Sequence, residues 1–329
     1  MSVRVAIRIP AAVAAAGAVS FTYQRIEEAR DCRRFPPPGR LVDIGGRCLH
    51  LVTAGEGSPT VVIIPALADN VLQWLPILEG VAAETQACVY DRAGIGWSDP
   101  PPRARRASEL MAADLHALLC AAGVAPPYVL AGHSIGGVIA RRFYAQHPAD
   151  VAGIVLIESS HEQQALKIAA ADWRMGASRY VFEAARRQVR PLGGRRLAAS
   201  LGLVRGFDAM IDREAPPGYR DANRAIVLSS RQRRVAVREL LMVARGLGRP
   251  PSLGSAPLTV LTRPRWEWRG WPIWAQLQDE LAALSTDSLH IHAERGGHYL
   301  QLDEPDLVIQ VIRGLVRRCR AAASLREGS

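Results

Sequence analysis

The pentapeptide Gly132-His133-Ser134-Ile135-Gly136, followed by Gly137, decides the fold of this chain. It comes after the apolar run 127–131 and before the segment 138–144, which predicts a strand, a sharp turn and a helix. A serine at the apex of such a turn presents its hydroxyl in an open cleft. Glycine flanks the turn because a side chain there would collide with neighbouring segments. The alternative is an ordinary Gly-rich turn whose serine only caps the helix.

Working outward from this turn, apolar strands alternate with helices. A hairpin is predicted around Gly45-Gly46, and continuous apolar runs predict buried parallel strands. The predicted strands are 41–44, 48–52, 60–64, 87–90, 127–131, 153–157, 258–262 and 289–292, and helices are expected within 69–83, 108–122 and 305–323. This alternation predicts an α/β fold with a doubly wound, mostly parallel, eight-stranded sheet.

The alternation stops after the strand 153–157 and resumes at 258. The intervening chain is rich in Ala, Arg and Leu and has few strand candidates. We therefore predict a helical cap over 162–250, inserted into a core formed by 40–161 and 251–324. Residues 1–39 are predicted to be an apolar N-terminal segment followed by a Pro-rich linker. A separate helical domain is the alternative to a cap.

Composition narrows the function classes. The 329 residues carry a net charge of +10, and 49% of them are hydrophobic, so a large core is feasible. The basic residues are nearly all arginines spread along the chain, without a zinc-finger or RNA-binding pattern, so we expect no nucleic-acid partner. The five cysteines are scattered, which indicates neither a metal site nor a disulfide framework.

The N-terminal segment has three interpretations. Its uncharged part, Ile9 to Tyr23, is 15 residues long, whereas a full membrane span needs about 20. It could be a transmembrane anchor, a secretory signal cleaved at Ala16-Gly17-Ala18, or a helix that packs on the domain. Localisation follows from this choice: membrane-associated for the anchor, cytoplasmic for the packed helix.

Three motifs in order resemble the α/β-hydrolase superfamily over roughly Leu41 to Arg318. The loop 91–100, Asp-Arg-Ala-Gly-Ile-Gly-Trp-Ser-Asp-Pro, resembles the family's D-R-x-G-x-G-x-S stretch. Ser134 occupies the place of the nucleophile, and Gly296-Gly297-His298-Tyr299 resembles the segment with the catalytic histidine. The resemblance implies a serine-nucleophile hydrolase.

The chemistry of the residues leads to the same assignment. A serine hydroxyl needs a base to take its proton, and His298 follows a strand in a glycine loop at the expected sheet edge. Among the other histidines, His161 is the serious rival. His133 is adjacent to Ser134, but its side chain should point away from the cleft.

The acid that orients the histidine is less certain, because the loop after the strand 258–262 lacks the family's usual Asp. Its carboxylate is Glu267, flanked by two tryptophans. Glu158 ends the strand 153–157, a position that holds the acid in some branches of the family, notably haloalkane dehalogenases. We favour Glu158, which keeps the chain order Ser, acid, His.

The remaining predictions concern transition-state binding and reaction. The oxyanion hole should use the backbone N–H groups of Ile135 and Leu67; Asp91 and Arg92 should brace the loop that carries Leu67. The chain is predicted to hydrolyse a small ester or related acyl substrate without a metal or organic cofactor. An acyltransferase on the same triad and a non-catalytic ligand-binding receptor are the alternatives.

Overall fold

The computed structural model describes residues 3–102, 108–171, 194–203, 210, 213–265 and 271–327. Its centre is an eight-stranded sheet of order β1-β2-β4-β3-β5-β6-β7-β8. The strands are β1 (Arg40–Asp43), β2 (Cys48–Ala54), β3 (Thr60–Ile64), β4 (Ala87–Tyr90), β5 (Tyr128–His133), β6 (Val151–Ile157), β7 (Leu258–Thr262) and β8 (Ser288–His292). β2 pairs antiparallel with β1 and β4, and the other pairs are parallel. The predicted fold class is confirmed.

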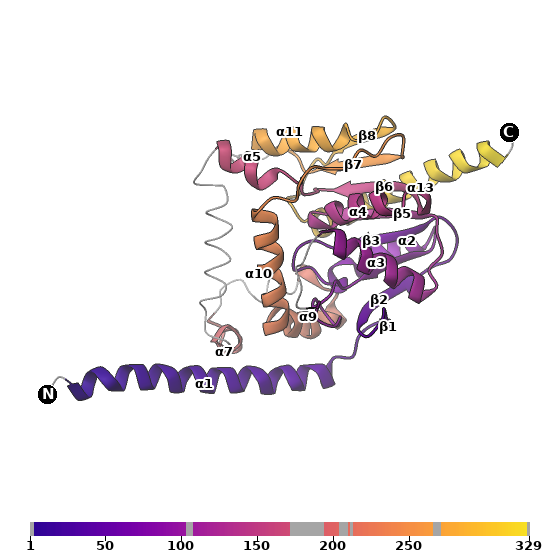
Figure 1. Ribbon diagram of the computed structural model, residues 1–329. Helices are drawn as coiled ribbons and strands as arrows, with labels where there is room; N and C mark the ends of the chain where they lie inside the picture. The colour runs from indigo at the N-terminus through magenta and orange to yellow at the C-terminus, as the bar shows by residue number, and fades with distance from the viewer. Residues whose placement is uncertain are drawn as a thin grey trace.

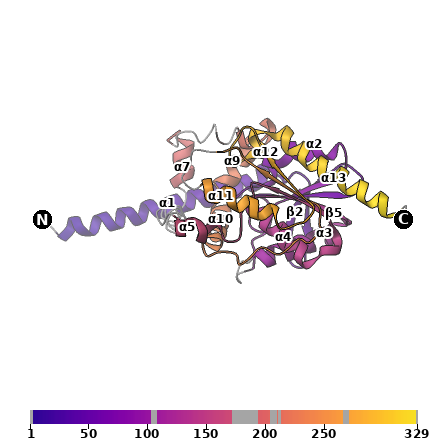
Figure 2. The same cartoon turned by 90° about the horizontal axis from the view of Figure 1, so that it is seen from above.

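Helices cover both faces of the sheet. α2 (Leu75–Ala82) and α13 (Pro305–Glu327) lie on one face, and α3 (Ser108–Ala122) and α4 (Ile135–Gln146) lie on the other (Figure 2). Neighbouring residues of one strand enter different cores: Ile63 packs with the α2 side and Ile64 with the α3 side. Both faces of the strands are therefore buried, which explains their continuous apolar sequences.

The helices between β6 and β7 lie at one end of the sheet (Figure 1). They are α5 (Gln164–Ala171), α7 (Gly194–Ser200), α9 (Arg220–Val227) and α10 (Ser230–Ala244). α10 begins at a serine cap, since Ser229 Oγ accepts a hydrogen bond from the Gln232 N–H at 3.1 Å. The described helices fall within the predicted cap segment 162–250, whose boundaries stay a prediction.

The remaining helices complete the core. α11 (Trp271–Ala282) lies between β7 and β8 in the sequence, and the short α12 (Leu300–Asp303) precedes α13. The single helix predicted within 69–83 is instead a 3₁₀ turn at Val71–Trp74 followed by α2. A capping box at Asn70 starts this turn, because its side chain accepts from the Leu72 N–H.

The expectation of a transmembrane anchor is wrong. Within the described part of the chain, no helix combines the length and the apolar character that a bilayer crossing requires. α1 (Val3–Arg34) has 32 residues, but its sequence from Gln24 onward is rich in charge, and the uncharged stretch before it is shorter than a span.

The charged end of α1 packs on the helices between β6 and β7. The Gln24 Nε2 donates to the Leu228 carbonyl at 2.9 Å, and Arg196 Nη1 lies 2.6 Å from Asp31 Oδ2. The N-terminal end of α1 projects away from the sheet (Figure 1). The charged half of α1 is thus held by these helices, and the packed-helix interpretation of Ile9 to Tyr23 stays a prediction.

Candidate active site

The turn between β5 and α4 is a strained nucleophile elbow. Ser134 has φ 52° and ψ −119°, a conformation that non-glycine residues rarely adopt. A Cβ at Gly132 would lie 2.5 Å from the Gly136 carbonyl oxygen, and one at Gly136 would lie 2.0 Å from the Ile64 carbonyl oxygen. The two flanking glycines are therefore required by the close approach of β3 and α4, as the sequence indicates.

Glu158 and His298 meet at the carboxyl edge of the sheet. Glu158 directly follows β6, is fully buried, and also has a positive φ, of 44°. Its Oε2 lies 3.2 Å from His298 Nδ1. The other oxygen, Oε1, accepts hydrogen bonds from the Arg263 N–H at 2.8 Å and from the Trp274 Nε1–H at 3.3 Å. The carboxylate is thus fixed on one oxygen and faces the imidazole with the other.

The surroundings of His298 favour the neutral imidazole. Burial lowers the pKa of His298 most, and nearby His133 and Arg263 lower it further, against the opposing effect of Glu158. The side chain keeps 32% of its surface exposed, so it can still be reached from outside. A neutral ring with Nδ1–H held by Glu158 presents the unprotonated Nε2, which is the tautomer that a general base needs.

The hydroxyl of Ser134 has a partner other than His298 here. Ser134 Oγ lies 3.4 Å from Ser160 Oγ, and the Ser160 N–H donates to the Ser134 carbonyl at 2.9 Å. Ser134 Oγ can accept from the Ser160 hydroxyl and still donate its own proton to another acceptor. Catalytic hydrogen bonds often tighten only in the substrate complex. Ser160 carries no sequence signal beyond its place two residues after Glu158.

The backbone around the elbow can supply an oxyanion hole. Ile135 is the first residue of α4, so its N–H has no acceptor within the helix. Leu67, on the loop after β3, packs against the apolar cluster that contains Ile135. The two predicted N–H donors thus come from segments that lie together.

Arg92 holds the loop that carries Leu67. Its guanidinium donates to the carbonyls of Pro65 at 2.5 Å and Ala66 at 2.7 Å. Arg92 also pairs with Glu239 of α10 at 3.0 Å, and both side chains are buried. The bracing role expected for Arg92 matches these contacts, but its acidic partner on α10 could not be read from the sequence.

His133 lies against the histidine loop. It is fully buried, and its Nε2–H donates to the His298 carbonyl at 2.7 Å. Its Nδ1 lies 3.6 Å from Asp69 Oδ2. That the side chain of His133 points away from the cleft stays a prediction, but the side chain does hold the backbone of His298. The only available signal for this was its place next to Ser134.

The rival base His161 has contacts outside this arrangement. His161 is buried, and its Nε2 lies 3.4 Å from Glu280 Oε2. The Nδ1 of His161 accepts a hydrogen bond from the Gln163 N–H at 3.0 Å. Burial is the main cause that lowers the pKa of His161. Glu267, the rival acid, lies outside the described residues.

One group of potential metal ligands occurs within the described ranges. His116, His147 and Asp150 have ligand atoms within 4.8 Å of one another. His116 is on α3, and His147 and Asp150 follow the C-terminus of α4, whereas Ser134 precedes the N-terminus of α4. The two imidazoles are stacked with centroids 3.7 Å apart and planes 5° apart. Parallel rings do not aim their lone pairs at one point, so this group is not arranged as a metal centre.

A nucleophile elbow between a parallel strand and a helix, with an acid and a histidine at the same sheet edge, defines the α/β-hydrolase class of folds. Comparison with protein families agrees. The family model described as "alpha/beta hydrolase fold" matches residues 59–305. The chain belongs to this family.

Solved structures with the same fold include esterases. An esterase from Thermogutta terrifontis is 22% identical, with a TM-score of 0.58 over 83% of this chain and 94% of that one. An esterase from Exiguobacterium antarcticum is 17% identical, with a TM-score of 0.62 over 85% and 99%. These similarities establish the fold.

Curated relatives match over shorter stretches. The "Putative carbamate hydrolase RutD" of Escherichia coli O157:H7 is 36% identical over 101 residues, which are 30% of this chain and 37% of that protein. The "Uncharacterized protein YqjL" of Bacillus subtilis is 34% identical over 104 residues, which are 32% of this chain and 41% of that protein. The chain thus spans less than half of each of these relatives.

Proposed function

We propose that this chain is a serine hydrolase that cleaves a small ester or related acyl substrate through an acyl-enzyme intermediate. The contact between Glu158 Oε2 and His298 Nδ1, beside the elbow of Ser134, carries the proposal. A carboxylate in contact with an imidazole beside a serine supports the proposal, because a serine nucleophile needs this relationship. Esterases of the same fold and a carbamate hydrolase among the relatives support acyl chemistry.

The proposed reaction begins with the Ser134 hydroxyl directed at Nε2 of His298. The Ser134 oxygen attacks the substrate carbonyl while Nε2 takes its proton. Glu158 holds Nδ1–H and stabilises the imidazolium that forms. The imidazolium then gives the proton to the leaving alcohol. Water attacks the acyl-enzyme by the same route, releasing the acid and restoring the hydroxyl.

The negative charge of each tetrahedral intermediate needs donors that are already in place. In the proposal, the Ile135 and Leu67 N–H groups bind this oxyanion. Because Arg92 holds the loop of Leu67 through two carbonyls, the second donor costs little reorganisation during the reaction. Removing one such donor costs roughly 10²–10³ in rate in comparable enzymes.

Labelling with a fluorophosphonate probe tests the proposal directly. The wild-type chain should be labelled and should hydrolyse p-nitrophenyl acetate, and Ser134→Ala should do neither. Ser160→Ala is the matched control, since it removes a neighbouring hydroxyl and should leave labelling intact. A wild-type chain that resists the probe would favour a ligand-binding receptor, and transfer of the acyl group to an added alcohol in preference to water would favour an acyltransferase.

A further inference from the structure

A cavity of about 430 Å³ lies between the second half of α1, the loop after β4, and the helices α9 and α10. Its size falls within the range of small-molecule sites, about 300–1,000 Å³. Ser134, Glu158 and His298 are not among the residues that line it. We call this cavity the α1 pocket; it is separate from the candidate active site.

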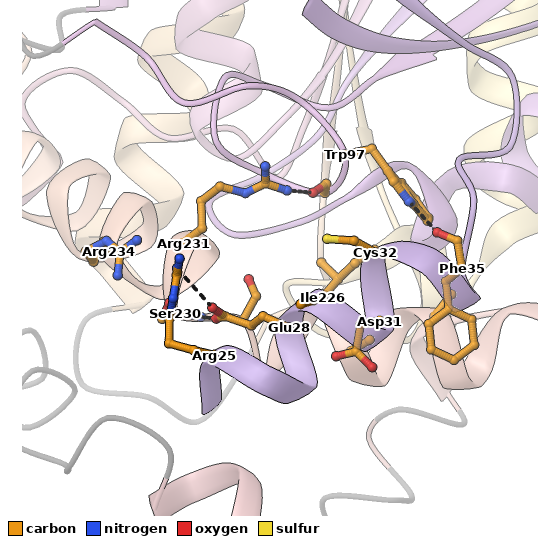
Figure 3. Close-up of a pocket in the computed structure, with 15 residues that line it drawn as sticks. Arg25, Glu28, Asp31, Cys32, Phe35, Trp97, Ile226, Ser230, Arg231 and Arg234 are labelled. Carbon is orange, nitrogen blue, oxygen red and sulfur yellow. Dashed lines mark hydrogen bonds and ion pairs between the residues drawn. The ribbon is translucent and has the colours of Figure 1, made fainter. Parts of the chain in front are cut away.

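One part of the α1 pocket is apolar. Trp97 is fixed there, because its Nε1–H donates to the Phe35 carbonyl at 2.9 Å. Ala222 and Ile226 of α9 are buried in the same lining. Trp97 and Phe35 lie at one end of the view in Figure 3, with Cys32 and Ile226 between them and the basic residues. These walls suit a hydrocarbon group.

The opposite part carries guanidinium groups. Arg25 and Arg234 lie across the view from Phe35, whereas the side chain of Arg231 extends toward the segment of Trp97 (Figure 3). Arg231 donates to the Gly96 carbonyl. Arg25 forms a long ion pair, in which its Nη1 lies 3.9 Å from Glu28 Oε2. In the described part of the chain, neither Arg231 nor Arg234 has a carboxylate within ion-pair distance.

The two carboxylates of the lining are already engaged. Glu28 Oε1 accepts from the Ser230 N–H at 2.5 Å and from Gln24 Nε2 at 2.9 Å. Asp31 pairs with Arg196, which is outside the lining, at 2.6 Å. Among the described residues, Arg231 and Arg234 thus add positive charge that no carboxylate of the lining pairs with, beside apolar walls.

We propose that the α1 pocket binds an amphiphilic monocarboxylate, with its carboxylate on the guanidinium group of Arg234 and its hydrocarbon part against Trp97 and Ile226. A guanidinium matches a carboxylate through paired hydrogen bonds. A single negative charge suits a lining in which three arginines stand beside two carboxylates. Such a ligand would also join α1 to α9 and α10.

Isothermal titration of the full chain with decanoate tests this inference. Saturable binding to the wild-type protein is expected, with decan-1-ol at least about tenfold weaker because it lacks the charge. Arg234→Gln should weaken decanoate binding about tenfold, the loss of one charge-assisted contact. Arg238→Gln, an exposed arginine of α10 outside the lining, is the matched control and should leave it unchanged.

A second variant tests whether decanoate binds in the α1 pocket itself, independently of the charge that Arg234→Gln removes. Ala225→Phe places a ring into the cavity from α9 and should also weaken decanoate at least about tenfold, while hydrolysis of p-nitrophenyl acetate and the melting temperature stay close to wild type. The inference is overturned if decanoate does not saturate, if decan-1-ol binds equally well, or if either pocket variant keeps wild-type affinity. Unchanged affinity in both variants would place decanoate elsewhere, for example in the cleft at Ser134.

Discussion

Replacing Glu158 with Gln is the sharpest test of the candidate triad. The wild-type carboxylate accepts three hydrogen bonds: from the Arg263 N–H, from Trp274 Nε1–H and from His298 Nδ1–H. The amide oxygen of Gln can keep the first two donors. Its NH₂ group then faces His298, and an NH₂ group donates where the carboxylate accepted.

This exchange reverses the tautomer of the base. With an NH₂ group opposite, Nδ1 becomes the acceptor and the proton moves to Nε2, the atom that should receive the Ser134 proton. The negative charge that steadies the imidazolium is also lost. A comparable change in a serine hydrolase triad lowers the rate by about 10⁴, or about 5.5 kcal/mol of transition-state stabilisation.

The fold should survive the same change. Glu158 is buried and its Oε2 lies 3.5 Å from Arg263 Nε, so the amide loses one partly buried ion pair. The free energy of unfolding should fall by about 1–3 kcal/mol, which leaves a domain of this size folded. Urea unfolding followed by circular dichroism measures this cost separately from the loss of activity.

The assay is kcat/KM on p-nitrophenyl acetate for wild type, Glu158→Gln and the matched control Glu267→Gln. We expect Glu158→Gln to be far more damaging than Glu267→Gln, with both proteins folded. Glu158→Gln within tenfold of wild type would refute the reasoning. A larger loss in Glu267→Gln would move the acid to the position usual in the family.

Three further predictions follow from the geometry. Burial lowers the pKa of His298, and in the proposed reaction the neutral imidazole is the base. The activity kcat/KM should therefore fall with acid at a midpoint below the ordinary pKa of histidine. A midpoint above that pKa would contradict the assignment of His298 as the base. His133→Phe keeps a ring but removes the 2.7 Å hydrogen bond to the His298 carbonyl, so kcat/KM should fall by about tenfold, and unchanged kinetics would show that this contact does not position the base. Arg92→Leu removes one partner of a buried ion pair with Glu239, and urea unfolding should show a loss of about 3–5 kcal/mol; Arg238→Gln, an exposed change on the same helix as Glu239, should cost almost nothing.

The sequence by itself determined the sheet and its elbow. Strands buried on both faces are mostly apolar along their length, so Thr60–Ile64 and Leu258–Thr262 could be placed to the residue. Gly132 and Gly136 marked the turn because only glycine fits beside the backbone of Gly136 and Ile64. These signals are local, since each depends on a few consecutive residues.

The tertiary structure alone decided which distant side chains meet. Glu158 and His298 are 140 residues apart, and their contact depends on the order of β6, β7 and β8 in the sheet. Trp274 reaches the same carboxylate from α11, and Glu239 reaches Arg92 from α10. Residue spacing along the chain carries no information about such contacts, because they are set by how whole elements pack.

The N-terminal helix α1 shows the same difference between what the sequence indicates and what the tertiary structure decides. Its apolar composition suggested a membrane anchor. Composition, however, determines only how polar the surface of a helix is, and does not determine what packs against that surface. Gln24 and Asp31 contact Leu228 and Arg196, which no local pattern could have indicated. Whether a polar side chain faces water or a partner is fixed by the tertiary fold, since only the fold brings the partner within reach.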